Sequence, residues 1–155
     1  MNNHRHKKGH RSLRLGRHSQ ANGIYLITSS TWQRTKIFAD WPYAHAAISA
    51  FTNADILQDA QLLCWVLMPD HAHWLLQLGQ DRSLPALVGA MKSASARAVR
   101  SSGYTQPVWV KAYHDQAIRR EEDIAQTARY IVANPLRAGL VNRIGDYPYW
   151  NAIYL

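Results

Sequence analysis

The hydrophobic pattern changes period several times along the chain, and each change marks a boundary between a predicted strand and a predicted helix. Short runs of β-branched, aromatic and other apolar residues indicate strands, and apolar residues three or four positions apart indicate helices. A Pro69-Asp70 turn joins the second strand directly to the third as a hairpin. The predicted strands are 23–28, 61–67, 71–78 and a stretch within 108–118, and the predicted helices are 40–53, 84–100 and 119–133.

This order of elements predicts an α+β fold of the ferredoxin-like (split βαβ) kind. In that fold an antiparallel sheet carries helices on one face, and we expect the other face to be free for a site. The chain has 155 residues, which is enough for one domain with a substantial core. We expect residues 21–155 to form this domain and residues 1–20 to form a basic, flexible arm.

The positive net charge of the chain indicates which class of partner it binds. The formal net charge is +8 and the pI is near 9.9, which indicates a polyanionic partner such as a nucleic acid. The alternative is that the basic residues only keep the protein soluble. No apolar stretch approaches the roughly 20 residues of a membrane span. A single cysteine, Cys64, suits a reducing cytoplasm and is expected to be a buried apolar residue, not a nucleophile.

Two histidines one residue apart are the strongest chemical feature of the sequence. Strand side chains alternate between faces, so His71 and His73 point to the same side and supply two of the ligands for a small divalent-metal site. Tyr130 and Asn134 lie four residues apart on the third helix, and the Asn134 amide oxygen is a credible third ligand for Mg²⁺ or Mn²⁺. Spacing alone leaves ordinary alternatives open: a hydrogen-bonded histidine pair, a packing tyrosine and an Asn-Pro turn.

Two motifs resemble those of a known family. Residues 68–73 (MPDHAH) and 130–141 (YIVANPLRAGLV) are similar to the motifs of the single-tyrosine HUH transposases. Within that family the chain looks most like the REP-associated tyrosine transposases, which act on repetitive extragenic palindromes. The resemblance runs from about residue 16 to residue 150. Asp70 stands where relatives frequently have Asn, Ala72 where a larger apolar residue is usual, and Gln116 where many have a histidine.

The resemblance implies a mechanism and a role for each matching residue. Tyr130 would be the catalytic nucleophile, and His71, His73 and Asn134 would bind Mg²⁺ or Mn²⁺. Members of the family cut single-stranded DNA beside a hairpin, leave a 5′-phosphotyrosine and a free 3′-OH, and rejoin strands by the reverse reaction. In the REP-associated branch the N-terminal segment helps to read a guide sequence. By analogy, we expect the arm to contact DNA through Arg11, Arg14 and Arg17.

Further basic residues are candidates for contacts with DNA phosphates. They are Lys92, Arg97 and Arg100 on the second helix and Arg137 after the third; the alternative is a solvated helix face for the first three and a helix C-terminal dipole partner for Arg137. The expected partner is single-stranded or hairpin DNA, and no membrane contact is expected. We expect a cytoplasmic protein that associates with the nucleoid. It is expected to be a monomer or a homodimer. Two other functions stay open: a non-catalytic hairpin-binding module, and a metal hydrolase for small phosphoesters that would need no Tyr130.

Overall fold

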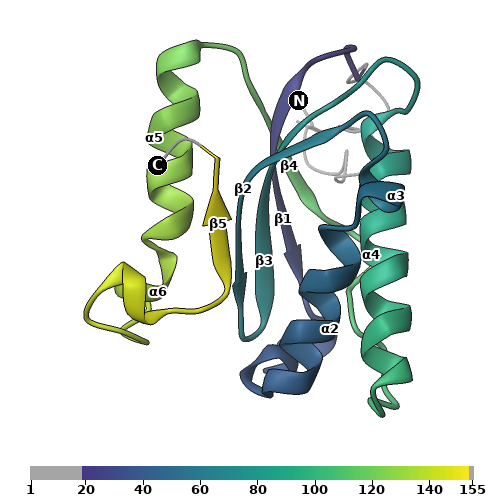
Figure 1. The fold of residues 1–155 in the computed structure, drawn as a ribbon, viewed down its shortest axis with the longest axis vertical. Helices are drawn as coiled ribbons and strands as arrows, with labels where there is room; N and C mark the ends of the chain where they lie inside the picture. The colour runs from purple at the N-terminus through teal and green to yellow at the C-terminus, as the bar shows by residue number, and fades with distance from the viewer. Residues whose placement is uncertain (1–18, 154–155) are drawn as a thin grey trace, which may run out of the picture.

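The protein is a single antiparallel sheet with helices packed on both of its faces (Figure 1). The computed structural model describes residues 19–153, so the predicted arm lies almost wholly outside the described residues. The strands follow one another across the sheet in the order β4-β1-β3-β2-β5. Short 3₁₀ turns occur at Trp32–Arg34, Ile37–Ala39 and Ile144–Asp146. The longer elements are β1 (Ile24–Ser30), α2 (Trp41–Phe51), α3 (Ala54–Leu57), β2 (Gln61–Met68), β3 (His71–Gln77), α4 (Leu84–Ser101), β4 (His114–Ile118), α5 (Glu121–Val132), α6 (Asn134–Arg137) and β5 (Trp150–Ala152).

The topology confirms the predicted ferredoxin-like fold. β3 lies between β1 and β2 and is antiparallel to both, and β4 pairs with the outer edge of β1. The helices that cross between these strands, α2 and α4, lie side by side on the same face of the sheet (Figure 1). Each of the seven predicted elements is present, with ends that differ from the prediction by a few residues.

Alternation along β3 sends its side chains into two separate environments. Ala72 and Trp74 are fully buried in the main core beneath α2 and α4, where Trp74 packs edge-on against Phe51. The histidines at 71 and 73 have the opposite parity and share their face with Leu75, which belongs to a second, smaller core. The sheet therefore separates the main core from the face that carries the histidines.

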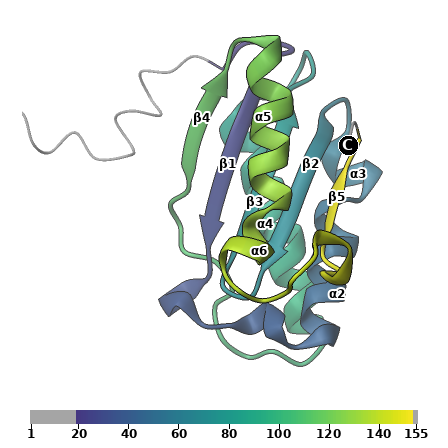
Figure 2. The same cartoon turned by 90° about the vertical axis from the view of Figure 1, so that its left-hand side faces the viewer.

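The second face of the sheet is covered by α5, which corrects the expectation of helices on one face only. Ala128 and Ile131 on α5 pack with Cys64 and Val66 of β2 in the second core. Figure 2 shows α5 lying across the middle strands of the sheet, with α6 below it. The physical reason is that β2 is apolar on both sides, so its second side must also be removed from water. The histidines lie beside α5 on this covered face.

The C-terminal part of the domain adds a fifth strand that the sequence pattern did not predict. β5 is only three residues long and pairs with the free edge of β2, where Trp65 is opposite Asn151. Three residues are too few for a periodic signal. The Tyr147 hydroxyl donates a hydrogen bond of 2.5 Å to the carbonyl of Leu67 and so anchors this segment. Within the described chain, no helix has the length and apolar character needed to cross a membrane.

Candidate active site

The two histidines are placed by the register of β3 with its neighbours. His71 is opposite Ser30 of β1, and His73 is opposite Thr28. The two imidazole rings face the same side with their centroids 5.0 Å apart, and their planes are nearly perpendicular at 85°. This confirms that both rings share one face of the strand.

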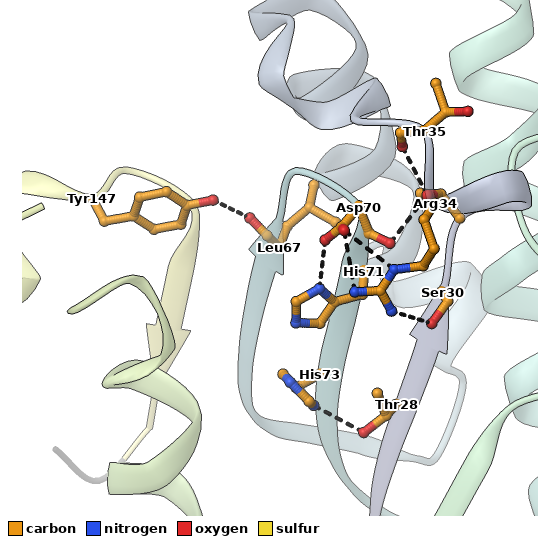
Figure 3. A network of polar contacts seen from close by, with 10 residues as sticks. Thr28, Ser30, Arg34, Thr35, Leu67, Asp70, His71, His73 and Tyr147 are labelled. Carbon is orange, nitrogen blue, oxygen red and sulfur yellow. Dashed lines mark hydrogen bonds and ion pairs between the residues drawn. The ribbon is translucent and has the colours of Figure 1, made fainter. Parts of the chain in front are cut away.

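Each imidazole uses its Nδ1 atom in a hydrogen bond within the protein (Figure 3). His73 Nδ1 lies 2.9 Å from the hydroxyl oxygen of Thr28, and His71 Nδ1 lies 2.8 Å from Oδ1 of Asp70. Such bonds fix the orientation of a ring and leave Nε2 as the atom that can bind a metal ion. The arrangement is therefore that of two oriented imidazoles, each with a second partner behind it.

The charge state of the site follows from its surroundings. Burial, together with the charges of His71 and Arg137, lowers the pKa of His73 to about 4. Partial burial acts to raise the pKa of the Asp70 carboxyl, but the hydrogen bond to His71 and the charge of Arg34 outweigh it and lower the pKa. His73 is consequently neutral at physiological pH, which is the state that ligates a metal, and Asp70 is ionised.

Tyr130 lies near the end of α5 and is contacted by Arg137 of α6. Its side chain is 54% exposed, unlike that of its neighbour Ile131, which is fully buried. The Arg137 guanidinium lies 3.9 Å from the centroid of the Tyr130 ring and also donates a 2.7 Å hydrogen bond to the Tyr130 carbonyl. The charge of the same guanidinium also contributes, after burial and His71, to the lowered pKa of His73.

Asn134 begins α6 and does not lie on the third helix as predicted, because α5 ends at Val132; the last turn of α5 still orients its side chain. Its Nδ2 atom donates to the carbonyl of Ile131 at 3.2 Å and, at a longer 3.4 Å, to that of Tyr130. An amide has one donor end and one acceptor end, so this orientation leaves Oδ1 as the available acceptor. The available donor atoms, two imidazole nitrogens and one amide oxygen, are of the types that Mg²⁺ or Mn²⁺ accepts as ligands. Among residues 19–153 there is no group of three or more His, Cys, Asp or Glu side chains that could hold a metal without such an amide.

The predicted basic contacts are distributed unevenly about this site. Arg137 is part of it, whereas Arg97 and Arg100 are exposed on α4, on the other side of the sheet. Lys92 donates hydrogen bonds to three backbone carbonyls in the 110–112 segment. These bonds give its ammonium group a structural role, so Lys92 is not among the proposed DNA contacts. The remaining predicted contacts, Arg11, Arg14 and Arg17, lie outside the described residues.

Three residues around the site were not singled out from the sequence. Thr28, Asp70 and Arg34 surround the histidines, and in the sequence Asp70 stands out only as a difference from relatives. Asp70 could have been found, because a carboxylate next to a candidate histidine ligand is a frequent orienting group. Arg34 contacts Asp70 across 36 positions of sequence, and no local pattern signals that contact. Cys64 is buried in the second core on the same face of the sheet. Burial raises the pKa of its thiol to about 12, which makes the thiol unreactive.

Fold and site together define an α+β domain in which an oriented pair of histidines lies on the sheet face covered by α5, the helix that also carries a half-exposed tyrosine. The chain belongs to the family described as "Transposase IS200 like", whose family model matches residues 19–134. The resemblance inferred from the motifs at 68–73 and 130–141 is thereby confirmed.

Individual relatives agree with the family assignment. The chain is 25% identical over 138 residues to a Haemophilus influenzae protein assigned as a REP-associated tyrosine transposase, a match that spans 82% of this chain and 78% of that protein. It is 25% identical over 91 residues to the REP-associated tyrosine transposase of Escherichia coli K12, covering 57% of this chain and 52% of the relative.

Two solved structures are similar in fold. A REP-associated tyrosine transposase bound to a REP hairpin superposes with a TM-score of 0.68 at 21% identity, covering 86% of this chain and 79% of that one. A Deinococcus radiodurans protein assigned as a transposase superposes with a TM-score of 0.53 at 26% identity, covering 70% and 87%.

Proposed function

We propose that this transposase-family protein cleaves and rejoins single-stranded DNA next to a palindromic hairpin, with Tyr130 as the nucleophile. The observation that carries the proposal is the position of Tyr130, half-exposed on the helix that covers the histidine face and stacked under Arg137. A tyrosine that served only packing would be buried in the second core like Ile131. A hydrolase that used the histidines alone would have no need for this tyrosine.

The proposed reaction is a transesterification. The Tyr130 phenol oxygen attacks the scissile phosphorus, the bond from phosphorus to the 3′ oxygen breaks, and the leaving strand takes a proton to become a free 3′-OH. The 5′ end stays attached to the enzyme as a phosphotyrosine ester. A 3′-OH can later attack this ester and displace Tyr130, which restores a DNA phosphodiester and the phenol. One ester is exchanged for another at each step, so no nucleotide cofactor is consumed.

The residues around Tyr130 have separable tasks in this scheme. Arg137 holds the ring from one face and brings a permanent positive charge to the place where the phenol loses its proton. The Nε2 atoms of His71 and His73 and the Oδ1 atom of Asn134 would bind Mg²⁺ or Mn²⁺. When bound, such an ion supplies charge neutralisation at the phosphate. The neutral state of His73 keeps its nitrogen available for this at physiological pH.

The proposed substrate is a DNA hairpin with a flanking single strand. The net charge of +8 favours a polyanion, and the similar structure described above was solved with a REP hairpin bound. Arg97 and Arg100 on α4, together with Arg11, Arg14 and Arg17 of the arm, are the proposed phosphate contacts outside the active site. The alternative of a non-catalytic hairpin-binding protein remains an outcome of the test below.

The test is a denaturing gel that detects a covalent adduct between protein and DNA. Wild-type protein and Tyr130→Phe are incubated with Mn²⁺ and a labelled single strand that carries a palindrome from sequence flanking the gene. We expect a shifted covalent band with wild-type protein only, because phenylalanine lacks the attacking oxygen. Hairpin affinity, measured in parallel, should change less than about twofold, since the ring and its stacking remain.

Matched controls separate the alternatives. Tyr104→Phe removes a hydroxyl from a tyrosine outside the site and should leave the adduct intact. A covalent band that persists in Tyr130→Phe would show that another residue is the nucleophile. Tight hairpin binding by wild-type protein without an adduct under any metal condition would favour the binding module.

A further inference from the structure

The contacts of Asp70 extend beyond His71 to Arg34, in the 3₁₀ turn that follows β1 (Figure 3). Asp70 Oδ1 accepts from His71 Nδ1, while Asp70 Oδ2 accepts from Nε of Arg34 at 3.2 Å and also lies 3.1 Å from its NH2 group. The remaining guanidinium nitrogen, NH1, donates to the Ser30 hydroxyl at 3.0 Å. Both carboxylate oxygens are therefore engaged, one by the imidazole and one by a guanidinium that is fixed at two points.

The loop that carries Arg34 is held against the histidine hairpin by its own backbone. Thr31 donates from its amide to the Asp70 carbonyl at 2.9 Å, and its hydroxyl oxygen lies 2.8 Å from the Thr35 carbonyl and 3.1 Å from that of Asp70. Gln33 and Arg34 have φ values of 56° and 54°, in the left-handed region that non-glycine residues rarely adopt. Such strain persists only where the surrounding structure fixes it, and it is typical of functional sites.

The two histidines differ in the group behind them. His73 contacts the neutral hydroxyl of Thr28, whereas His71 contacts a carboxylate that is itself paired with Arg34. A carboxylate behind an imidazole fixes the tautomer that leaves Nε2 unprotonated and makes that nitrogen a better ligand. A carboxylate at a turn without a second partner could rotate away from the ring, and the contact of Arg34 Nε and NH2 with Oδ2 opposes this rotation.

We propose that Arg34 is a positioning residue of the metal site, acting on His71 through the Asp70 carboxylate. The inference rests on the proposed function, because it assumes that His71 binds a divalent ion. It adds a role for a residue in the loop after β1, which no motif of the chain marks. Arg34 has a side chain 59% exposed, so direct contact with DNA is the competing explanation, and the experiment must separate the two.

The test measures Mn²⁺ binding by the full chain without DNA, from the electron paramagnetic resonance signal of free Mn²⁺ during titration. We expect wild-type protein to bind one ion and His71→Ala to lose binding. Asp70→Ala should weaken binding by about tenfold to a hundredfold, the range for a group that orients a metal ligand. Arg34→Ala should weaken it by about fivefold, because the carboxylate remains but is no longer fixed.

A double variant tests the route through Asp70. Asp70→Asn keeps an oxygen for His71 Nδ1 but removes the ion pair with Arg34, so it should weaken Mn²⁺ binding less than Asp70→Ala does. In the Asp70→Asn background, Arg34→Ala should have no further effect on Mn²⁺ affinity. The matched control is Arg143→Ala, which breaks the exposed ion pair with Asp146 and should bind Mn²⁺ as wild-type protein does.

Each other outcome overturns the inference in a recognisable way. Wild-type Mn²⁺ affinity in Arg34→Ala, with loss only in His71→Ala, would refute the role of Arg34 and leave the proposed function standing. An equal effect of Arg34→Ala with Asp or Asn at position 70 would refute the route through the carboxylate. No Mn²⁺ binding by wild-type protein would refute both this inference and the proposed metal site. Circular dichroism of each variant establishes that it is folded.

Discussion

His71 and His73 differ in their surroundings although they stand two residues apart on one strand. Burial affects His73 strongly and lowers its pKa from the ordinary value of 6.5 to about 4. A buried neutral imidazole lies ready to bind a metal, but it opposes folding in acid, because the unfolded chain takes up a proton that the folded chain does not. The same residue therefore connects the chemistry of the site to the stability of the protein.

This connection gives a prediction for stability in acid. With a folded pKa of about 4 and an unfolded value of 6.5, the contribution of His73 is complete above pH 6.5 and is lost as the pH falls towards 4. Between pH 7 and pH 4.5 the loss should be about 2–3 kcal/mol in the free energy of unfolding. Urea denaturation of wild-type protein and His73→Gln at both pH values measures the difference. His45→Gln, which removes an exposed imidazole, is the control. Equal pH dependence in wild-type protein and His73→Gln would contradict this account of His73.

The junction of α5 and α6 determines where Tyr130 points. α5 ends at Val132, Pro135 is buried at the start of α6, and the short turn between them brings Arg137 back over the tyrosine ring. Packing of the α5 apolar stripe on β2 fixes the helix, and Arg137 fixes the ring at its end. The position of Tyr130, the proposed nucleophile, therefore depends on two helices and on the turn that joins them.

Replacing Arg137 by lysine tests this geometry while keeping the positive charge. A lysine lacks the planar group that stacks on the ring and donates to the Tyr130 carbonyl. We expect Arg137→Lys to slow adduct formation by about tenfold with hairpin affinity nearly unchanged, because a misplaced nucleophile costs rate and not binding. Single-turnover cleavage and equilibrium binding measure the two effects. If affinity falls as much as the rate, Arg137 acts as a DNA contact. Arg129→Lys, one position before the tyrosine, is the matched control.

At the scale of the whole molecule, the positive charge lies on several separate surfaces. Arg137 and Arg34 are at the histidine face, Arg97 and Arg100 are on α4 across the sheet, and further basic residues precede residue 19. A DNA molecule that reached all of them would pass from one face of the sheet to the other.

The contribution of the arm can be measured from the salt dependence of binding. Substituting alanine for Arg11, Arg14 and Arg17 together removes three positive charges from the full chain. If all three contact phosphates, the slope of log affinity against log salt should fall in magnitude by about 2, from roughly 0.7 per contact on single-stranded DNA. Fluorescence anisotropy over a salt series gives the slope. Replacing Arg119, Arg120 and Arg143 removes an equal charge elsewhere, and the same change in slope there would mean that the arm has no special role.

The sequence alone determined those features that depend on neighbouring residues. The periods of the apolar pattern fixed the seven elements and their order, and the single residue between His71 and His73 fixed their common face. These are local relations, set by 2 residues per repeat in a strand and about 3.6 in a helix. Tyr130 and Asn134 stand four residues apart, but the helix predicted to carry both ends at Val132, and Asn134 begins α6.

Only the tertiary structure decided which distant residues meet. The contact of Arg34 with Asp70, the hydroxyl of Thr28 behind His73, and the covering of the second face by α5 each join segments far apart in sequence. The arginines of α4 and α6 look alike in sequence, yet the sheet places them on opposite faces. Strand register and helix packing set these relations, because the apolar side chains of a face are removed from water together with their neighbours. Those neighbours come from distant segments, so a local sequence pattern does not identify them.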